Sequence, residues 1–187
     1  MASTAPVAVV IMAAGKGTRM RSAVPKVLHT IGGRSLLDHA VAAARGLRPD
    51  HLVVVVRHER DAVVAHLSEV APDAVAADQD ETPGTGRAVA CGLASLPEDL
   101  AGPVVVTSGD VPLLDTATLR ALLAQHVERG DAVTLLTTVL DDPTGYGRVV
   151  READGTVSAI VEQRDASPEQ RAITEINAGV YVFDAAH

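Results

Sequence analysis

The stretch VAVVIMAAGKGTRM (residues 7–20) joins an apolar run to a glycine-rich turn. The run Val7–Met12 is short, rich in β-branched residues and uncharged, which is typical of a strand that is covered on both faces. The glycines of Gly15-Lys16-Gly17 then permit a tight connection to the next element. The pattern predicts a buried parallel strand that ends in a loop able to approach a ligand.

Similar apolar runs recur and alternate with helical patterns. The expected strands are Val7–Met12, Leu52–Val56, Val104–Thr107 and Ala132–Val139. The expected helices are Ser35–Leu47, Glu59–Val70, Arg87–Leu96 and Thr116–Arg129. Because strand–helix alternation with right-handed crossovers builds doubly wound sheets, we predict an α/β fold, a Rossmann-like doubly wound and mostly parallel sheet. Ligands of such sheets bind beyond the carboxyl ends of the strands, which selects the loops after Met12, Val56, Ala77 and Thr107.

The pattern changes after about residue 140. Short strand-like pieces at Arg148–Arg151, Val157–Glu162 and Gly179–Phe183 are separated by turn signals such as Asp154-Gly155. We interpret this part as a small mixed-sheet excursion that covers one end of the core. The 187 residues are then expected to form one domain, residues 1–187, that includes the excursion.

Composition excludes several classes of protein. With 47% hydrophobic and 21% charged residues the chain is globular rather than disordered. Cys91 is the single cysteine, which excludes a disulfide framework and a Cys-based zinc site. No apolar run approaches the ~20 residues that span a bilayer. No positive charge precedes the apolar run Ala5–Gly15, which argues against a signal peptide, so we expect a cytoplasmic protein.

The charge is distributed unevenly along the chain. A net charge of −8 argues against a nucleic-acid binder. The first 37 residues nevertheless hold no acidic residue and five basic ones, namely Lys16, Arg19, Arg21, Lys26 and Arg34. The chain's only two lysines, Lys16 and Lys26, both fall in this segment. Such a compact basic segment favours a small anionic ligand, although an uneven run of charge without function is the alternative.

The loop after the first strand fits phosphate binding. It is neither a Walker A sequence nor a dinucleotide fingerprint, because the third glycine of the latter would fall at Met20. Its backbone N–H groups can approach phosphate oxygens, Arg19 can donate two hydrogen bonds to one phosphate, and Lys26 supplies a point charge. The alternative is that the glycines only make a tight strand-to-helix turn.

An acidic residue follows another predicted strand. Asp110, in Ser108-Gly109-Asp110, comes just after Val104–Thr107, at the carboxyl end of that strand. A single carboxylate there suits Mg²⁺, which takes one or two protein oxygens and completes its shell with phosphate and water. The alternative is an aspartate that caps a turn before Pro112.

Two further groups of residues could contact a nucleotide or a sugar. Gln79 can donate and accept at once, as a nucleobase edge requires, and it precedes Gly84-Thr85-Gly86. Gly147, Glu162 and Asn177 could contact sugar hydroxyls. Gln79 alone would indicate an ordinary loop, and each of the other residues taken alone favours a structural role. We find no Ser-His-Asp or Cys-His arrangement, and the seven histidines lack metal-ligand spacing.

The motifs resemble a known family. AAGKGTRM (residues 13–20), with PKVL shortly after, is similar to the signature of sugar-1-phosphate nucleotidyltransferases. The resemblance is more particular in the longer segments, which cover nearly the whole chain in order: GKGTRMRSAVPKVLHTIGGRSLLDH, SGDVPLL, LDDPTGYGRVVRE, IVEQRDA and EINAGVYVFD. These resemble the N-terminal uridylyltransferase (pyrophosphorylase) domain of the bifunctional N-acetylglucosamine-1-phosphate uridylyltransferase/glucosamine-1-phosphate acetyltransferase family.

The resemblance implies a Mg²⁺-dependent reaction of UTP with N-acetylglucosamine-1-phosphate that gives UDP-N-acetylglucosamine, for peptidoglycan and cell-wall synthesis, and pyrophosphate. It implies roles for individual residues. Arg19 and Lys26 would stabilise the phosphates, and Asp110 would bind the metal. The remaining residues would contact substrates: Ala13, Ala14 and Gly15 the nucleotide, Gln79, Gly84 and Thr85 the uracil, and Gly147, Glu162 and Asn177 the N-acetylglucosamine.

Two departures from the family pattern stand out. Pro83 occupies a position before Gly-Thr-Gly where the family commonly has leucine, so another base remains an alternative to uracil. The family's domain also continues beyond the position of His187 with an asparagine that completes the metal site, a linking helix and a trimer-forming acetyltransferase β-helix. The resemblance therefore implies an incomplete domain. The open alternatives are another sugar-1-phosphate nucleotidyltransferase and a catalytically impaired nucleotide-binding module.

Overall fold

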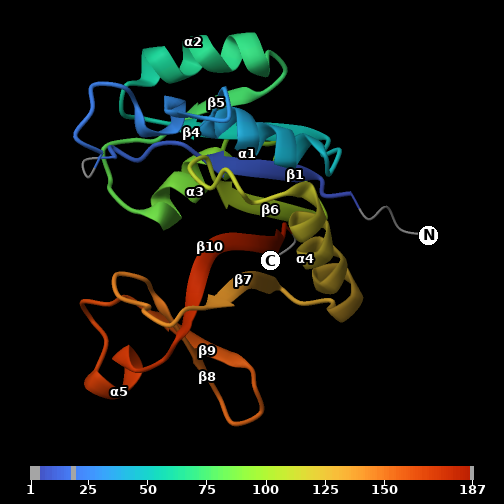
Figure 1. Cartoon of the computed structure of the whole chain (residues 1–187). Coiled ribbons are helices and arrows are strands. Elements are labelled where there is room, and N and C mark those ends of the chain that lie inside the picture. The colour runs from blue at the N-terminus through green and yellow to red at the C-terminus, as the bar shows by residue number, and fades with distance from the viewer. Residues whose placement is uncertain (1–4, 18–19, 186–187) are drawn as a thin grey trace. The chain divides into compact units, whose positions relative to one another are not determined.

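The structure is a computed structural model that describes residues 5–17 and 20–185 (Figure 1). The chain divides into two compact units. Unit 1 runs up to Thr134 and includes the chain from Tyr181 onward, and unit 2 is Leu135–Val180. Each unit is described by itself.

Unit 1 is built on a parallel sheet with the strand order β5-β4-β1-β6. The strands are β1 (Ala8–Met12), β4 (His51–Val56), β5 (Val75–Asp78) and β6 (Pro103–Ser108). In β1 and β4 successive residues are fully buried, so helices cover both faces of the sheet. This arrangement explains why these strands read as unbroken apolar runs rather than alternating ones.

Four helices cover this sheet. They are α1 (Leu36–Arg45), α2 (Arg60–Val70), α3 (Thr85–Leu93) and α4 (Thr116–Arg129). Ser35 caps α1 in a reciprocal capping box with Asp38, and Asp115 caps α4 by accepting from the Thr118 N–H. Gly130, with a φ of 64°, ends α4 in the left-handed conformation.

Shorter elements complete unit 1. A 3₁₀ turn, η2 (Lys26–Leu28), follows the glycine-rich loop. The strands β2 (Thr30–Ile31) and β3 (Arg34–Ser35) form a hairpin around Gly32-Gly33. The last residues of β10 (Glu175–Asp184) pair antiparallel with β6, with Tyr181 opposite Val106.

Unit 2 is a small antiparallel structure. The strands β8 (Arg148–Arg151) and β9 (Val157–Val161) form a hairpin with a bulge at Val150/Arg151, and β8 also pairs with β10. β7 (Val133–Val139) pairs with β10 as well. The four-residue helix α5 (Pro168–Arg171) begins with a capping box at Ser167.

The prediction of a doubly wound, mostly parallel α/β sheet is confirmed, and the bounds of α4 and β8 agree with the expected ones. For one strand the predicted burial was wrong. Ala132–Val139 was expected to be buried on both faces, but β7 is partly exposed along its whole length, because it belongs mostly to the small unit, which has no helical layers on both sides. β10 begins at Glu175 rather than at Gly179. None of the helices in the described part of the chain has the length and apolar character needed to cross a bilayer.

Candidate functional site

In the sheet of unit 1, the direction in which successive strands are added reverses between β1 and β6. The chain passes from β1 outward to β4 and β5, and then returns to place β6 on the other side of β1. Ligands of doubly wound sheets bind in the crevice at such a point, outside the carboxyl ends of the strands. Here the two strand ends are joined directly, because the Gly109 N–H donates to the Met12 carbonyl at 2.9 Å.

Lys26 reaches from η2 to Asp110, at the end of β6. Pro25 precedes the turn, and the Leu28 N–H donates to its carbonyl at 2.9 Å, which fixes the lysine backbone. Gly17 lies against the lysine stem: a Cβ at residue 17 would lie 2.6 Å from the Lys26 Cβ, and φ of Gly17 is +61°. Both the left-handed conformation and the close contact therefore require glycine at position 17.

Asp110 forms an ion pair with Lys26 at the end of β6. The Lys26 ammonium donates to Oδ2, and the Ser108 hydroxyl donates to Oδ1 at 2.6 Å. Burial alone would raise the pKa of Asp110, but these hydrogen bonds outweigh it and hold the pKa below its usual value. The carboxylate is therefore charged at neutral pH, and sequence reasoning had not identified Ser108 as its partner.

This carboxylate fits a divalent cation in its chemistry. It is a charged oxygen donor at the carboxyl edge of the sheet, and 24% of its side chain is exposed. Both oxygens already accept a hydrogen bond, so a cation bound at Oδ2 has to share or replace the contact with Lys26. In the described part of the chain no group of three or more His, Cys, Asp and Glu side chains is arranged around a common metal position.

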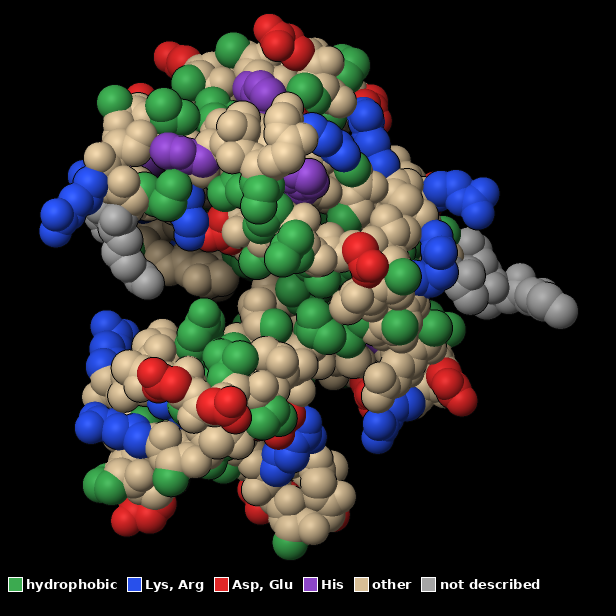
Figure 2. Space-filling view, viewed as in Figure 1, with side chains coloured by type: hydrophobic (Ala, Val, Ile, Leu, Met, Phe, Trp, Pro, Cys, Tyr) green, Lys and Arg blue, Asp and Glu red, His purple; other side chains and the backbone are tan. Residues whose placement is uncertain are grey.

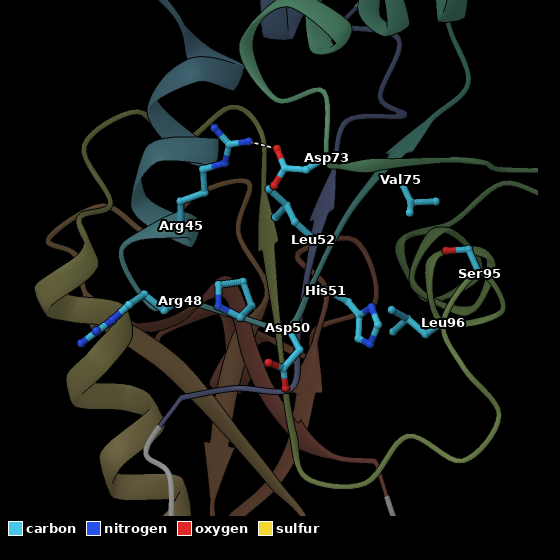
Figure 3. Close-up of a pocket in the computed structure, with 10 residues that line it drawn as sticks. Arg45, Arg48, Asp50, His51, Leu52, Asp73, Val75, Ser95 and Leu96 are labelled. Atoms are coloured by element: carbon cyan, nitrogen blue, oxygen red, sulfur yellow. Dashed lines mark hydrogen bonds and ion pairs between the residues drawn. The ribbon is translucent and has the colours of Figure 1, made fainter.

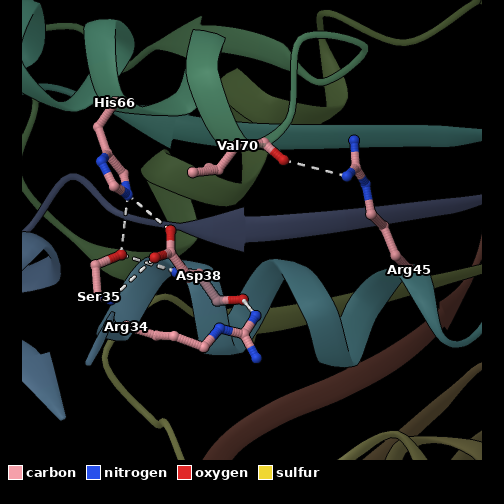
Figure 4. A network of polar contacts seen from close by, with 6 residues as sticks. All are labelled: Arg34, Ser35, Asp38, Arg45, His66 and Val70. Carbon is pink, nitrogen blue, oxygen red and sulfur yellow. Dashed lines mark hydrogen bonds and ion pairs between the residues drawn. The ribbon is translucent and has the colours of Figure 1, made fainter. Parts of the chain in front are cut away.

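The other residues of the basic segment and the glycine-rich loop differ in where the structure places them. Arg19 lies outside the described residues. Ala13 and Ala14 are buried, and Ala14 packs in the core beside Ala88, so only their backbone can face a ligand. Gly15 is exposed, with nothing within 4 Å of the position a Cβ would take. Arg34, a member of the basic segment, donates to the Asp38 carbonyl on α1 instead (Figure 4).

Two of the predicted base-contacting residues, Gln79 and Gly84, lie in the loop between β5 and α3, and Thr85 is the first residue of α3. The Gln79 N–H donates to the Val56 carbonyl at 2.9 Å, which places Gln79 at the carboxyl edge beside β4. Its side-chain amide donates within the loop, to the carbonyls of Thr82 (2.9 Å) and Gly84 (3.3 Å). Gln79 therefore holds the shape of the loop, and its remaining oxygen is the group that can accept a hydrogen bond from a base.

Unit 2 brings the three predicted sugar-contacting residues together. The Asn177 N–H donates to the Gly147 carbonyl at 3.0 Å. A Cβ at Gly147 would lie 3.3 Å from Glu162 Oε1, so the Glu162 carboxylate lies directly over this glycine. The Asn177 side-chain oxygen accepts the Gly179 N–H at 3.0 Å, which orients the amide. The Glu162 carboxylate, the Asn177 amide and the Gly147 backbone are thus adjacent in the structure, although Gly147 and Asn177 are 30 residues apart in the sequence.

A cluster of Ser35, His66 and Asp38 forms beside α1 (Figure 4), although the sequence showed no such arrangement. His66 Nε2 is 3.1 Å from the Ser35 hydroxyl and 2.7 Å from Asp38 Oδ1. One ring nitrogen serves both contacts, whereas a nucleophilic triad uses the two nitrogens separately. Burial would raise the pKa of Asp38, but hydrogen bonds from His66 and Ser35 lower it below its usual value. The cluster caps α1.

A pocket of about 240 Å³ lies at the opposite edge of the sheet (Figure 3). Its lining includes His51, the first residue of β4, and Val75, the first residue of β5. Arg45 and Asp73 form an ion pair at its rim (Figure 3), so charges of both signs line it. It is at the amino ends of the strands, away from Lys26 and Asp110, and we do not assign the candidate site to it.

Basic side chains do not form a continuous surface on the face of the molecule seen in Figure 2. Lys and Arg lie there in separate groups with acidic and neutral residues between them, as far as the described residues show. A nucleic-acid interface needs an extended basic stripe. The candidate site is instead local: one lysine and one aspartate at the β1–β6 strand ends.

The chain is similar in sequence to known proteins. The family model described as the MobA-like NTP transferase domain matches residues 9–173. Two relatives named "Bifunctional protein GlmU", from Kineococcus radiotolerans and Clavibacter sepedonicus, are each 59% identical, over 97% and 96% of this chain. The chain covers only 37% and 36% of those relatives, or little more than a third of their length.

Two solved structures share the fold. A putative glucose-1-phosphate thymidylyltransferase from Bacillus anthracis superposes with a TM-score of 0.77 at 19% identity, covering 94% of this chain and 70% of its own. A UDP-glucose pyrophosphorylase complexed with UDP-glucose gives a TM-score of 0.72 at 15% identity, covering 96% and 76%. At these identities the likeness concerns the fold alone.

Proposed function

The chain belongs to the family of MobA-like NTP transferase domains, and we propose that it transfers the uridylyl group of UTP to N-acetylglucosamine-1-phosphate. The observation that carries the proposal is the Lys26–Asp110 pair at the carboxyl ends of β1 and β6, within a chain 59% identical to proteins named GlmU. In this reaction a phosphate oxygen of the sugar phosphate attacks the α-phosphorus of UTP. The bond from that phosphorus to pyrophosphate breaks, and UDP-N-acetylglucosamine forms.

The reaction needs no nucleophile from the protein. Catalysis then consists of aligning two anionic reactants and neutralising their charge. Lys26 supplies a positive charge held by η2 and Gly17, and the exposed backbone at Gly15 can donate to phosphate oxygens. Arg19 is proposed as a second cation, from its place in the sequence alone.

The strand order supports a nucleotide laid along the carboxyl edge of the sheet. Gln79 follows β5, the loop with Gly15 follows β1, and Asp110 follows β6. With the order β5-β4-β1-β6, the base loop and the aspartate are three strand spacings apart, or about 14 Å. This span suits an extended nucleoside triphosphate, with the uracil at Gln79, Gly84 and Thr85 and the phosphates at Gly15 and Lys26.

We propose that Asp110 holds the divalent cation of the reaction and that this cation is Mg²⁺. When bound, it neutralises charge on the phosphate oxygens. A cation at Asp110 would also affect Lys26. A cation held at Asp110 Oδ2 would share or replace the contact with Lys26, and the Lys26 ammonium would then be able to donate to phosphate. The pair therefore keeps the lysine ordered in the absence of substrate.

The acceptor is proposed to bind in unit 2. Glu162 and the Asn177 amide offer an acceptor and a donor for sugar hydroxyls and the N-acetyl group, and the buried Gly147 accepts the Asn177 N–H and so holds Asn177 beside Glu162. We extend the proposal to the longer protein: a bifunctional cytoplasmic enzyme, trimeric through an acetyltransferase part, that supplies peptidoglycan precursors. The name and greater length of the relatives support a bifunctional protein, and the other properties are those that the family resemblance implies.

A pyrophosphate-release assay tests the proposal. The chain is incubated with UTP and Mg²⁺ and with N-acetylglucosamine-1-phosphate, glucosamine-1-phosphate or glucose-1-phosphate. Release with the N-acetylated sugar alone supports the assignment, and Asp110→Asn should remove it. Release with glucose-1-phosphate at the same rate would contradict the proposed acceptor, and release with CTP, GTP or dTTP in preference to UTP would contradict the proposed base.

A further inference from the structure

Arg148 is a buried cation that the proposed reaction does not use. It lies in β8, and only 1% of its surface is exposed. None of the ion pairs found among the described residues includes it. Burying a guanidinium without a carboxylate partner is costly, and arginines are seldom fully buried unless they are paired. Its position therefore needs an explanation other than packing.

The guanidinium is held by two neutral acceptors. One terminal nitrogen donates to the Tyr146 carbonyl and the other to Gln163 Oε1, and Nε has no hydrogen-bond partner. The charge of Arg148 also lowers the pKa of Asp142, though hydrogen bonds from Thr144 contribute more. The side chain thus faces the loop that leads into Gly147.

The two acceptors are neighbours of proposed sugar-contacting residues. Tyr146 directly precedes Gly147, and Gln163 directly follows Glu162. Arg148 itself pairs with Val161 in the β8–β9 ladder. One planar group therefore ties the loop that presents the Gly147 backbone to the strand end that presents the Glu162 carboxylate. A guanidinium suits this task because its two terminal nitrogens donate at a fixed separation, whereas an ammonium is a point charge.

We propose that Arg148 is a positioning residue for the sugar part of the substrate: by bridging Tyr146 and Gln163 it sets the spacing between the Gly147 backbone and the Glu162 carboxylate. The inference rests on the proposed function for the identity of the sugar. The geometric part, that Arg148 orders the Gly147 loop, stands independently of it.

Binding of a matched ligand pair tests the inference in the full chain. UDP-N-acetylglucosamine and UDP differ only by the sugar, so the ratio of their dissociation constants measures the sugar contacts. Arg148→Met and Gln163→Leu should each weaken UDP-N-acetylglucosamine binding about tenfold, the effect of losing a charged hydrogen bond. UDP binding should change by less than about twofold. Arg148→Lys should not restore the ratio, and Gln163→Glu, which keeps the acceptor, should preserve it.

The matched control is Arg151→Met. Arg151 lies on the same strand but is paired with Glu175, away from Gln163, so its loss should lower stability without changing the ratio. Equal weakening of both ligands by Arg148→Met, or an unchanged ratio in that variant, would overturn the proposal. If Arg151→Met shifts the ratio as strongly, the effect is general destabilisation and the proposal also fails.

A second readout separates this inference from the proposed function. Amide hydrogen exchange of Asn177, whose N–H donates to the Gly147 carbonyl, reports the order of the loop without any ligand. Exchange of the Asn177 amide should accelerate in Arg148→Met and Gln163→Leu, relative to exchange of the Val149 and Ile160 amides in the hairpin. If the parent chain binds both ligands equally, the sugar assignment fails, and the exchange measurement alone decides whether Arg148 orders the loop. Unchanged Asn177 exchange would overturn that role.

Discussion

Lys26 and Asp110 are the two residues on which the account of the site depends most. In the absence of ligand each satisfies the other, and Ser108 and Gly17 hold them in place. The ion pair keeps the Asp110 carboxylate charged and ordered, because a half-buried carboxylate without a partner would be neutralised or disordered. In the proposed function, a cation or phosphate bound here would share or replace these charged contacts.

Lys26→Ala should weaken UTP binding by about 10–100-fold, because a charged hydrogen bond to phosphate is lost. The free energy of unfolding should fall by only about 1 kcal/mol, since the pair is partly exposed, with 36% of the lysine side chain accessible. Calorimetric titration and urea denaturation measure the two effects. Lys16→Ala, which removes the other, exposed lysine of the segment, is the matched control and should change binding far less. Unaltered UTP affinity in Lys26→Ala would contradict the phosphate-loop assignment.

Gly17→Ala should destabilise the protein and displace Lys26. The new Cβ would lie 2.6 Å from the Lys26 Cβ at a φ of +61°, and the left-handed conformation alone costs about 1 kcal/mol. Thermal denaturation with and without UTP detects both losses. Gly15→Ala is the control for stability, because nothing lies within 4 Å of its Cβ position, so it should melt like the parent. Equal melting temperatures for the two variants would count against the contact between Gly17 and Lys26.

At the scale of elements, α3 lies unusually close to the sheet. Gly92 faces β1 and β4, and a Cβ there would lie 2.7 Å from Val10 Cγ1 and 2.8 Å from Val55 Cγ2. The helix carries the loop with Gly84 and Thr85 at its N-terminus, so its distance from the sheet sets where that loop lies. Small residues on α3, such as Ala88, let the two layers approach.

Gly92→Ala should therefore lower the free energy of unfolding by about 1–3 kcal/mol through overpacking. Gly86→Ala in the same helix has nothing within 4 Å of its Cβ and should be neutral or slightly stabilising, since alanine favours helix. Urea denaturation of both variants gives the comparison. A stabilised Gly92→Ala would show that α3 does not press on β1 and β4 as described.

The ion pair between Arg151 and Glu175 ties β8 to β10 and predicts a dependence of stability on pH. The hydrogen bonds from Arg151 lower the pKa of Glu175 from 4.5 to about 2, against the effect of burial. A lowered carboxyl pKa stabilises the fold above 4.5, and this contribution disappears as the pH falls toward 2. Because the Arg151 side chain is 40% exposed, we expect the ion pair to contribute only about 1 kcal/mol to the free energy of unfolding.

Comparing the parent with Glu175→Gln isolates this contribution. Between pH 6 and pH 2.5, urea denaturation should show the parent losing about 1 kcal/mol more than the variant. Other carboxylates titrate in both proteins and cancel in the difference. Parallel stability curves over this range would mean that the pair contributes nothing.

For the whole molecule, much of unit 1 was predictable because local and tertiary signals agree. The valine runs of β1 and β4 are buried on both faces, and Ser35 and Asp115 cap the helices they precede. The approach of Asp110 to the loop after β1 followed from the adjacency of parallel strand ends. These inferences needed only periodicity and topology.

The remaining features depend on contacts between distant segments. Ala132–Val139 is rich in β-branched residues like a core strand but contains Thr134, Thr137 and Thr138, and most of it belongs to the smaller unit, where it is partly exposed. The bridge from Arg148 to Gln163 spans 15 residues and has no periodic signature. Likewise, Ser35, Asp38 and His66 meet because α1 and α2 are neighbours, and helix spacing alone could not show it.

The central claim is that the carboxyl ends of β1 and β6, with Lys26 and Asp110, form a metal-assisted UTP site. Calorimetric titration of the chain with UTP, CTP, GTP, ATP and dTTP, each with and without Mg²⁺, tests it most directly, with Asp110→Asn as the companion variant. The account predicts selective binding of UTP that strengthens with Mg²⁺ in the parent and no longer does so in Asp110→Asn. Preference for another base, or a Mg²⁺ effect that survives in Asp110→Asn, would contradict it.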